Sequence, residues 1–283
     1  MFRCRLCIAP RSALPMISSD AEIRGRLEAI LDNYPVGLLL DIDGTISPIA
    51  STPEAASVPE PIRVLLGRLA ARLALVAAVS GRAAADAARM VGVTGMVYAG
   101  NHGLEMFRDG LSVPLPEAAP FQDAIAEVLR SAEVELPSPG LIFENKGLTA
   151  SVHYRLAADP AAAGAEAGTV LERLASMHGL RLTAGRMVWE IRPPLEANKG
   201  TAVRRLITEY RLRGAIFCGD DRTDVDAFTV LSDLQSAGTC ETLNVGIAAA
   251  EMPREVRAGA DVLVDGVTGM ERLLRELVEL AGA

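Results

Sequence analysis

Short, unbroken apolar runs are the most prominent pattern along this chain. One of them, at residues 36–40, shows no polar alternation, and similar runs lie at residues 73–79 and 215–218. A strand that is covered on both faces in a parallel sheet has this pattern. Stretches with apolar residues at helical spacing lie between the runs, for example at residues 59–71 and 201–211. The alternation predicts an α/β fold with a doubly wound, Rossmann-like parallel sheet.

The pattern changes near residue 106, where prolines begin to interrupt the chain. Residues 106–193 predict a β-α-β-β-α-β-β module of the size of a small domain, with helices at residues 121–136 and 160–178 and paired strands at residues 141–154. We therefore predict that the core domain consists of residues 20–105 and 194–283 and that residues 106–193 form an inserted α/β cap.

Composition excludes several classes of function. Half of the 283 residues are hydrophobic and the formal net charge is −8, so the chain can bury a large core. A negative charge without a run of Lys and Arg argues against binding nucleic acid or an anionic membrane. No apolar run approaches the ~20 residues that span a bilayer. We therefore expect a soluble, cytoplasmic monomer whose partner is a small molecule.

The first 19 residues are basic and are expected to form a disordered tail. Pro10 and Pro15 interrupt this stretch before the apolar core of a signal peptide could form, and Met16 is an alternative start. Cys4 and Cys7 have C-x-x-C spacing, but no second pair or nearby His completes a metal or redox site. Four cysteines in a chain of this length do not make a disulfide framework, which fits a reducing cytoplasm.

Two aspartates directly follow the first buried run. Asp41 is the first polar residue at the predicted strand's carboxyl end, where open α/β sheets bind ligands. Asp43 comes two residues later, Gly44 permits a tight turn, and Thr45 offers a hydroxyl group to an anion. A carboxylate pair can bind a hard cation and attack an electrophile. The alternative is an ordinary turn, in which Asp and Gly are common.

Two later strand ends carry residues of complementary chemistry. Ser80 precedes Gly81 and an alanine-rich helix, so its hydroxyl and the helix N–H groups can bind a phosphate, although a plain N-cap has the same pattern. Asp220, Asp221 and Asp224 follow another buried run. Carboxylates so close together repel one another, and a divalent cation is the simplest remedy.

Polar residues at two other places point to function less directly. Lys199 lies in the first turn of a predicted helix, where a positive charge is electrostatically unfavourable; a functional role explains this placement, and a solvated lysine is the alternative. Glu144, Lys146 and Arg155 lie on or beside predicted cap strands. Carboxylate and cationic groups suit sugar hydroxyls, which need both acceptors and donors, but a solvated strand face is the simpler reading of charge alone.

The motifs, taken in order, resemble those of the haloacid dehalogenase superfamily of phosphotransferases. They are D-x-D-G-T at residues 41–45, S-G-R at 80–82, the lysine at 199 and G-D-D-x-T-D at 219–224. G-N-H-G at 100–103, E-N-K at 144–146 and H-Y-R at 153–155 resemble the trehalose-6-phosphate phosphatase family in particular. Val225 departs from that pattern, because an acidic residue usually follows the fourth motif. We assign no chemistry to His102.

The resemblance implies a magnesium-dependent phosphatase that converts trehalose 6-phosphate and water to trehalose and phosphate. It implies that Asp41 attacks phosphorus to form an aspartyl-phosphate, while Asp43 protonates the leaving oxygen and later accepts a proton from water. The expected Mg²⁺ ligands are the Asp41 carboxylate, the Asp43 backbone carbonyl and Asp220. Asp221 and Asp224 are expected behind them or in contact through water.

The resemblance also implies the groups that hold the substrate. The phosphoryl oxygens are expected to contact Thr45, Ser80 and Lys199. The other residues expected to bind substrate are Arg82, Glu144, Lys146, Arg155 and Glu190. Two alternatives stay open: a related phosphatase acting on sucrose phosphate, a glycosylglycerate phosphate or a hexose phosphate, and a non-catalytic sugar-phosphate binding module. The complete set of Asp41, Asp43, Lys199 and Asp220 argues against the second alternative, and only cap residues discriminate among sugars.

Overall fold

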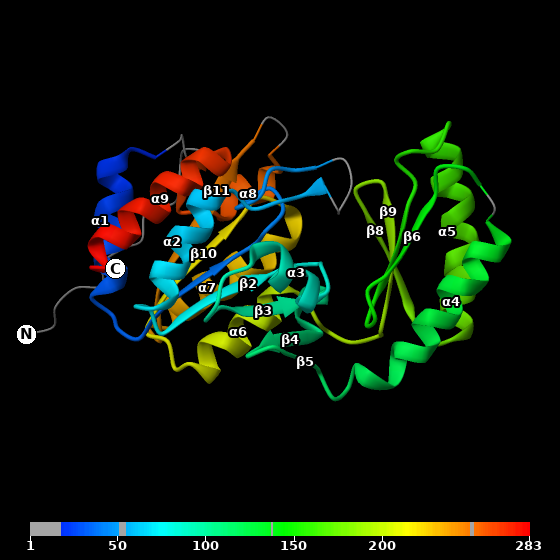
Figure 1. Cartoon of the computed structure of the whole chain (residues 1–283), viewed down its shortest axis with the longest axis horizontal. Helices are drawn as coiled ribbons and strands as arrows, with labels where there is room; N and C mark the ends of the chain where they lie inside the picture. The colour runs from blue at the N-terminus through cyan, green and yellow to red at the C-terminus, as the bar shows by residue number, and fades with distance from the viewer. Residues whose placement is uncertain (1–17, 51–54, 137, 250–251) are drawn as a thin grey trace, which may run out of the picture.

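The computed structural model describes residues 18–50, 55–136, 138–249 and 252–283. The Cys4 and Cys7 pair, Met16 and the predicted tail up to residue 17 lie outside the described residues. The described chain forms two β-sheets, each with its own helices (Figure 1). None of the helices in these ranges combines the length and the hydropathy that a membrane span requires.

The large sheet has eight strands in the order β12-β11-β10-β1-β2-β3-β4-β5. Its parallel strands are β1 (Val36–Leu40), β2 (Leu75–Val79), β3 (Val97–Gly100), β10 (Gly214–Gly219), β11 (Glu241–Ala248) and β12 (Val262–Asp265). Every residue of β1, β2 and β10 is buried, as their unbroken apolar runs predict. The predicted doubly wound α/β fold is confirmed.

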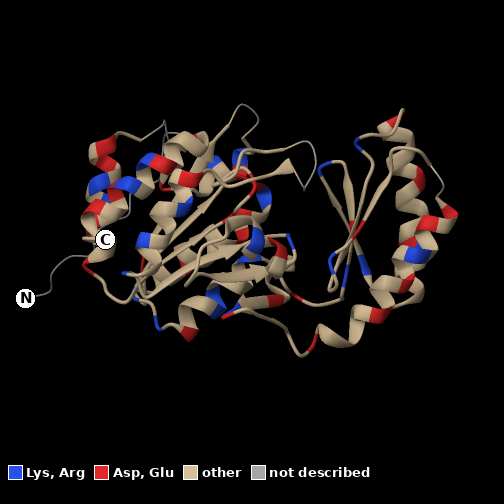
Figure 2. Ribbon diagram, in the orientation of Figure 1, with Lys and Arg blue, Asp and Glu red and all other residues tan. Residues whose placement is uncertain are grey.

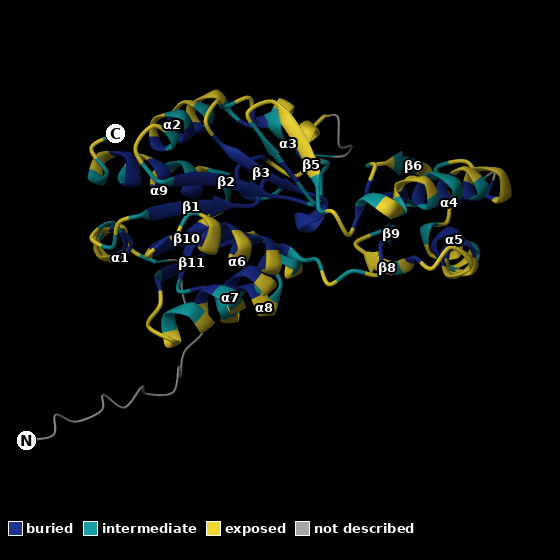
Figure 3. Cartoon of the chain, turned by 90° about the horizontal axis from the view of Figure 1, so that it is seen from below, coloured by how far each residue is buried: buried dark blue, intermediate teal, exposed yellow. Residues whose placement is uncertain are grey.

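Helices cover both faces of the large sheet, as Figure 3 shows. The helices on one face are α1 (Asp20–Leu31), α2 (Glu60–Ala70), α3 (Ala84–Val91) and α9 (Gly266–Leu280), and those on the other are α6 (Lys199–Glu209), α7 (Val225–Ser236) and α8 (Arg254–Gly259). Successive side chains of a strand point to opposite faces. Leu38 and Leu40 of β1 therefore pack with the first group, whereas Leu39 packs with the second.

An antiparallel hairpin of β4 (Glu105–Arg108) and β5 (Leu111–Pro114) extends the large sheet beyond β3. The boundary predicted at residue 106 assigned most of this hairpin to the cap, and the structure differs. The turn between the strands contains Asp109 at φ 52° and Gly110 at φ 82°, and Asp-Gly is a strong signal for a tight hairpin. The change of pattern at residue 106 thus marks the end of the strand-helix alternation and not the end of the sheet.

The small sheet is antiparallel, with the order β6-β7-β9-β8. Its strands are β6 (Ile142–Asn145), β7 (Ala150–His153), β8 (Arg181–Gly185) and β9 (Val188–Arg192). One face packs against α4 (Gln122–Glu135) and α5 (Pro160–Met177). These helices lie on the outer side, so the other face of the small sheet is turned toward the large domain (Figure 1). We call residues 119–192 the small domain.

Candidate active site

The loops after β1, β2, β3 and β10 meet at one edge of the large sheet. Leu40 pairs with both Ala78 and Cys218 across the sheet, and Ala99 pairs with Val79. Since these parallel strands end in register, the residues that follow them are brought together from distant parts of the chain. The predicted strand-end motifs therefore lie at a common edge.

Asp41, Lys199 and Asp224 form a buried charged group at this edge. Their exposed fractions are 5%, 3% and 0%. The Lys199 Nζ lies 2.9 Å from Asp41 Oδ1 and 2.7 Å from Asp224 Oδ1. Burial opposes the charge on Lys199, but Asp224 and Asp41 outweigh this effect and raise its pKa. The ammonium group therefore stays charged next to the predicted nucleophile.

The start of α6 is stabilised in spite of the lysine at its first position. Asn198 Oδ1 accepts a hydrogen bond from the Thr201 N–H at 2.8 Å, and the Asn198 N–H donates to Thr201 Oγ1 at 3.0 Å. This capping box satisfies backbone groups at the helix N-terminus. The unfavourable placement of Lys199 that the sequence shows is thus balanced by Asp41 and Asp224 from two other loops.

Asp41, Asp220 and Asp224 form a group of carboxylates that fits a metal ion. One oxygen from each lies within 4.8 Å of the others. Burial and the neighbouring Asp224 raise the pKa of Asp220 to about 7, and burial raises the pKa of Asp41. Lys199 compensates this excess negative charge only in part, and an all-oxygen donor set suits a hard divalent cation such as Mg²⁺.

The orientation of these carboxylates distinguishes metal ligands from supporting groups. Asp224 Oδ1 already binds Lys199, and its Oδ2 accepts hydrogen bonds from the Asp220 and Asp221 N–H groups, both at 3.0 Å. Asp221 is exposed and its side chain caps the short helix that begins at Arg222. Asp224 and Asp221 are therefore held by protein contacts, which leaves Asp41 and Asp220 as the better candidate ligands.

Gly44 is required at the turn after β1 for two reasons. Its φ is +89°, a conformation that L side chains rarely adopt. A Cβ at this position would also lie 2.1 Å from Asp220 Oδ2. Thr45 is buried next to it and donates its hydroxyl to Asp220 Oδ1 at 3.2 Å. The turn after β1 thus lies directly against the candidate metal ligand from β10.

Asp43 and Arg82 form a bidentate ion pair. Arg82 Nε donates to Asp43 Oδ2 and its terminal nitrogen donates to Oδ1, both at 2.7 Å. Charge-assisted pairs of this geometry are strong and directional. Ser80 is buried, and its hydroxyl accepts a hydrogen bond from the Arg82 N–H at 3.2 Å. Arg82, predicted to bind substrate, therefore orients the predicted acid and base in this structure.

The small sheet brings Glu144, Lys146 and Glu190 together on the face turned toward the large domain. Lys146 Nζ lies 3.6 Å from Glu144 Oε2 and 3.7 Å from Glu190 Oε1. Burial opposes the ionisation of Glu190, but its contact with His102 and the charges of Lys146 and Arg192 bring its pKa down to about 2. We call Glu144, Lys146 and Glu190 the Lys146 cluster.

Arg155 does not join this cluster in the part of the chain that the structure describes. It is exposed and donates to the Arg186 carbonyl at 3.5 Å, at the turn between β8 and β9. The strands of the small sheet carry both basic and acidic residues, whereas acidic residues predominate on its outer helices (Figure 2).

Two residues of the G-N-H-G segment contact the small domain, although no chemistry is predicted for them from the sequence. His102 is buried, and its Nε2 lies 3.6 Å from Glu190 Oε2 of the small sheet. Burial lowers the pKa of His102. Asn101 is completely buried and also reaches the small domain. The available signal was the motif itself: Asn and His directly before Gly, after a buried strand.

Val225, the departure from the family pattern, is the first residue of α7 and packs against the hydrophobic core under the large sheet. The contacts between Asp41, Lys199 and Asp224 are complete without an acid at this position.

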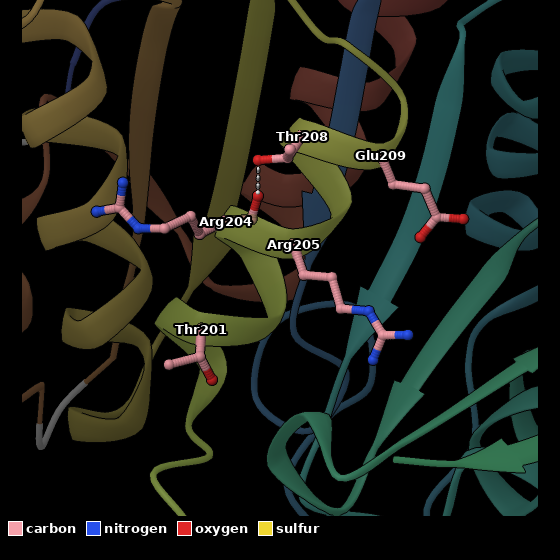
Figure 4. A pocket seen from close by; sticks show the side chains of 5 residues that line it. All are labelled: Thr201, Arg204, Arg205, Thr208 and Glu209. Carbon is pink, nitrogen blue, oxygen red and sulfur yellow. Dashed lines mark hydrogen bonds between the residues drawn. The ribbon is translucent and has the colours of Figure 1, made fainter. Parts of the chain in front are cut away.

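A shallow groove on the outer face of α6 is separate from this site (Figure 4). It is lined by Thr201, Arg204, Arg205, Thr208 and Glu209. These residues lie on the opposite side of the helix from Lys199, Ala202 and Val203, which are buried. The groove therefore has no direct part in the chemistry described above.

Comparison with known proteins agrees with the site. The doubly wound fold is similar to that of a haloacid dehalogenase-like hydrolase from Bacteroides thetaiotaomicron, with a TM-score of 0.57 at 13% identity, covering 84% of this chain and 98% of that one. The chain belongs to the trehalose-phosphatase family, whose model matches residues 39–258.

Two curated relatives support this assignment. Trehalose-phosphate phosphatase of Mycobacterium avium (strain 104) is 37% identical over 225 residues, which cover 77% of this chain and 56% of that protein. Probable trehalose-phosphate phosphatase 4 of Oryza sativa subsp. japonica is 32% identical over 255 residues, 86% of this chain and 65% of that protein. The chain thus spans little more than half the length of the first of these curated relatives.

The fold is also similar to the C-terminal domain of Candida albicans trehalose-6-phosphate phosphatase, with a TM-score of 0.72 and 22% identity, covering 92% of this chain and 97% of that one. The structure of a trehalose-6-phosphate phosphatase related protein gives a TM-score of 0.73 at 24% identity, covering 87% of this chain and all of the other. At these identities the likeness concerns the fold alone.

Proposed function

We propose that this chain is a phosphoric monoester hydrolase that converts trehalose 6-phosphate and water to trehalose and phosphate. The observation that carries the proposal is the buried contact between Asp41 and Lys199, next to Asp220. It provides an anionic nucleophile with a fixed positive partner at the edge of the sheet where α/β folds bind ligands. The family assignment supports the same reaction.

In the proposed first step, a carboxylate oxygen of Asp41 forms a bond to phosphorus as the bond from phosphorus to the sugar oxygen breaks. Asp43 gives its proton to that oxygen. In the second step, water attacks the aspartyl-phosphate and transfers a proton to Asp43, and the bond to Asp41 breaks. Lys199, Thr45 and Ser80 hold the phosphoryl oxygens, where negative charge is stabilised in the transition state.

The donor set described above supports Mg²⁺ as the cofactor. Asp41, Asp220 and the backbone carbonyl of Asp43 would hold it, with Asp224 and Asp221 behind them. When bound, Mg²⁺ supplies positive charge to the phosphoryl oxygens and offsets the carboxylates. Among the residues in the described ranges, the Asp41, Asp220 and Asp224 group is where carboxylates converge in this way.

The ion pair with Arg82 restricts the proton transfers proposed for Asp43. Both carboxylate oxygens of Asp43 accept hydrogen bonds from Arg82, so neither is available to a leaving oxygen. We infer that the substrate phosphate attracts the Arg82 guanidinium, which suits phosphate geometry, and thereby releases Asp43. This exchange agrees with the predicted role of Arg82 in substrate binding.

We further propose that the small domain acts as the cap that recognises the sugar. The Lys146 cluster presents two carboxylates and one ammonium group to the large domain. Such a set accepts and donates hydrogen bonds to sugar hydroxyls. Glu190 stays ionised because its pKa is low, so it accepts hydrogen bonds throughout the neutral range. Arg155 is a candidate at the edge of this surface.

The location and assembly of the protein complete the proposal. We propose a monomer in a reducing cytoplasm, which agrees with the free, buried thiols of Cys218 and Cys240. Size-exclusion chromatography coupled to light scattering tests the monomer.

Phosphate release from a panel of substrates tests the reaction. The panel contains trehalose 6-phosphate, sucrose 6-phosphate, a glucosylglycerate phosphate, glucose 6-phosphate and p-nitrophenyl phosphate. We expect the highest kcat/KM for trehalose 6-phosphate, loss of turnover in EDTA and recovery with Mg²⁺. Asp41→Asn is expected to be inactive, because an amide is not an anionic nucleophile. Preference for another sugar phosphate would contradict the assignment of trehalose 6-phosphate as the substrate. Turnover by Asp41→Asn would contradict the proposed mechanism.

A further inference from the structure

Asn101 joins three parts of the molecule through one buried side chain. It follows β3, has a φ of 50° and has no exposed surface. Its Nδ2 donates to Glu105 Oε1 at 2.7 Å and to the Lys146 carbonyl at 3.0 Å, and its Oδ1 accepts a hydrogen bond from the Thr149 hydroxyl. Its backbone N–H donates to the Arg82 carbonyl at 2.7 Å. Asn101 thus connects the Arg82 loop to the turn that carries Lys146.

Glu105 holds this amide in one orientation. Its Oε1 also accepts a hydrogen bond from the Ala84 N–H at 2.8 Å, and its Oε2 accepts one from the Ser112 hydroxyl at 2.7 Å. The Asn101 NH₂ group faces two acceptors and its oxygen faces a donor, so all polar atoms are matched. An aspartate here would place an oxygen against the Glu105 carboxylate and the Lys146 carbonyl.

Apolar packing also holds the turn that carries Lys146 against the large domain. Leu148, which lies in the turn between Lys146 and Thr149, is 2% exposed and clusters with Leu104 and Ala118. Within the turn, the Lys146 N–H donates to the Thr149 carbonyl at 2.9 Å. The turn that carries Lys146 is therefore seated on the large domain by hydrogen bonds on one side and by buried apolar contacts on the other.

We propose that Asn101 is a positioning residue that sets the distance between the loop that carries Ser80 and Arg82 and the Lys146 cluster, and thereby selects substrates that carry both a phosphate and a second sugar. The proposal rests on the proposed function. A substrate that contacts both sites needs their spacing to be correct, and a misplacement of about 1 Å costs on the order of 100-fold in rate. An aryl phosphate contacts only the first site and is insensitive to this spacing.

Kinetics of three variants of the Mg²⁺-loaded enzyme test the proposal. Asn101→Asp keeps a residue type that tolerates positive φ but reverses one side of the hydrogen-bond pattern. Thr149→Val removes one hydroxyl from a buried site, and Thr149→Ser retains it. We expect kcat/KM for trehalose 6-phosphate to fall by roughly tenfold or more in Asn101→Asp and about threefold to tenfold in Thr149→Val, as for a lost buried hydrogen bond. Thr149→Ser should restore the activity, and turnover of p-nitrophenyl phosphate should stay within about twofold.

Hydrogen exchange separates this proposal from the proposed function. We expect faster amide exchange at residues 145–149 in Thr149→Val and no change in α5. If the wild-type protein does not hydrolyse trehalose 6-phosphate but exchange changes in this way, the proposed function fails. The proposed positioning of the Lys146 turn by Asn101 is then still supported. Equal kinetic losses on both substrates, or unchanged exchange together with unchanged kinetics, would show that Asn101 does not position the cluster.

Discussion

Replacing Lys199 with methionine removes the positive charge that contacts both Asp41 and Asp224. At an effective dielectric constant of about 20, unit charges about 3 Å apart attract one another by roughly 5 to 6 kcal/mol. Both contacts are of this length, and all three residues are at most 5% exposed. Desolvation of the ions cancels much of this attraction in the wild type. In Lys199→Met the two carboxylates keep their desolvation cost and lose their partner.

We therefore expect Lys199→Met to lower the free energy of unfolding by about 3 to 5 kcal/mol, the usual cost of removing one member of a buried ion pair. A second substitution, Asp224→Asn, removes one of the two carboxylate charges that Lys199→Met leaves without a partner. It should recover about 2 kcal/mol of the lost free energy of unfolding. The double variant should remain inactive, because Asp41 still lacks its ammonium partner. Stability and activity are thus expected to separate.

Urea unfolding at pH 7.5 in EDTA measures these differences, since chelation prevents a divalent cation from replacing the lost charge. Arg205→Met is a matched control on the same helix. Arg205 lies on the exposed outer face of α6 (Figure 4), where a substitution usually changes stability by no more than about 0.5 kcal/mol. A loss below about 1 kcal/mol in Lys199→Met, or one no larger than in the control, would refute this reasoning.

Three other predictions concern the cluster on the small sheet and the proton transfers. Lys146→Ala should reduce kcat/KM for trehalose 6-phosphate at least tenfold more than for p-nitrophenyl phosphate; equal losses in parallel assays would mean that Lys146 supports folding or the core site. In Asp43→Asn, rapid quench with p-nitrophenyl phosphate should show a burst of nitrophenol near the enzyme concentration, because this leaving group needs little protonation whereas hydrolysis of the aspartyl-phosphate needs a base; absence of a burst, with equal slowing of both substrates, contradicts that role. Glu190 has a folded-state pKa of about 2 against an ordinary value near 4.3, so its ionised form stabilises the folded state by about 3 kcal/mol above pH 4.3, and this stabilisation is lost as the pH falls toward 2. Glu190→Gln should therefore cost about 3 kcal/mol in unfolding experiments at pH 7 and clearly less at pH 3, and an equal cost at both values would rule out the electrostatic explanation.

The elements that the sequence predicted well are those whose environment shows in local composition. A strand that is buried on both faces must be apolar at every position, so β1, β2 and β10 could be recognised without knowledge of their neighbours. Because parallel strands end at a common edge, the sequence also predicted that Asp41, Ser80 and Asp220 would follow such strands at one side of a sheet. No local pattern paired Lys199 with Asp41, and this contact appears only in the tertiary structure.

Other features depended on contacts between residues far apart in the chain. The hairpin of β4 and β5 belongs to the large sheet because β4 pairs with β3, and a short strand carries no local sign of which sheet it joins. Arg82 binds Asp43 across 39 residues. Asn101 reaches Lys146 across 45. The identity of each partner depends on which loops the completed sheet and the small domain bring together, so only the tertiary structure could pair them.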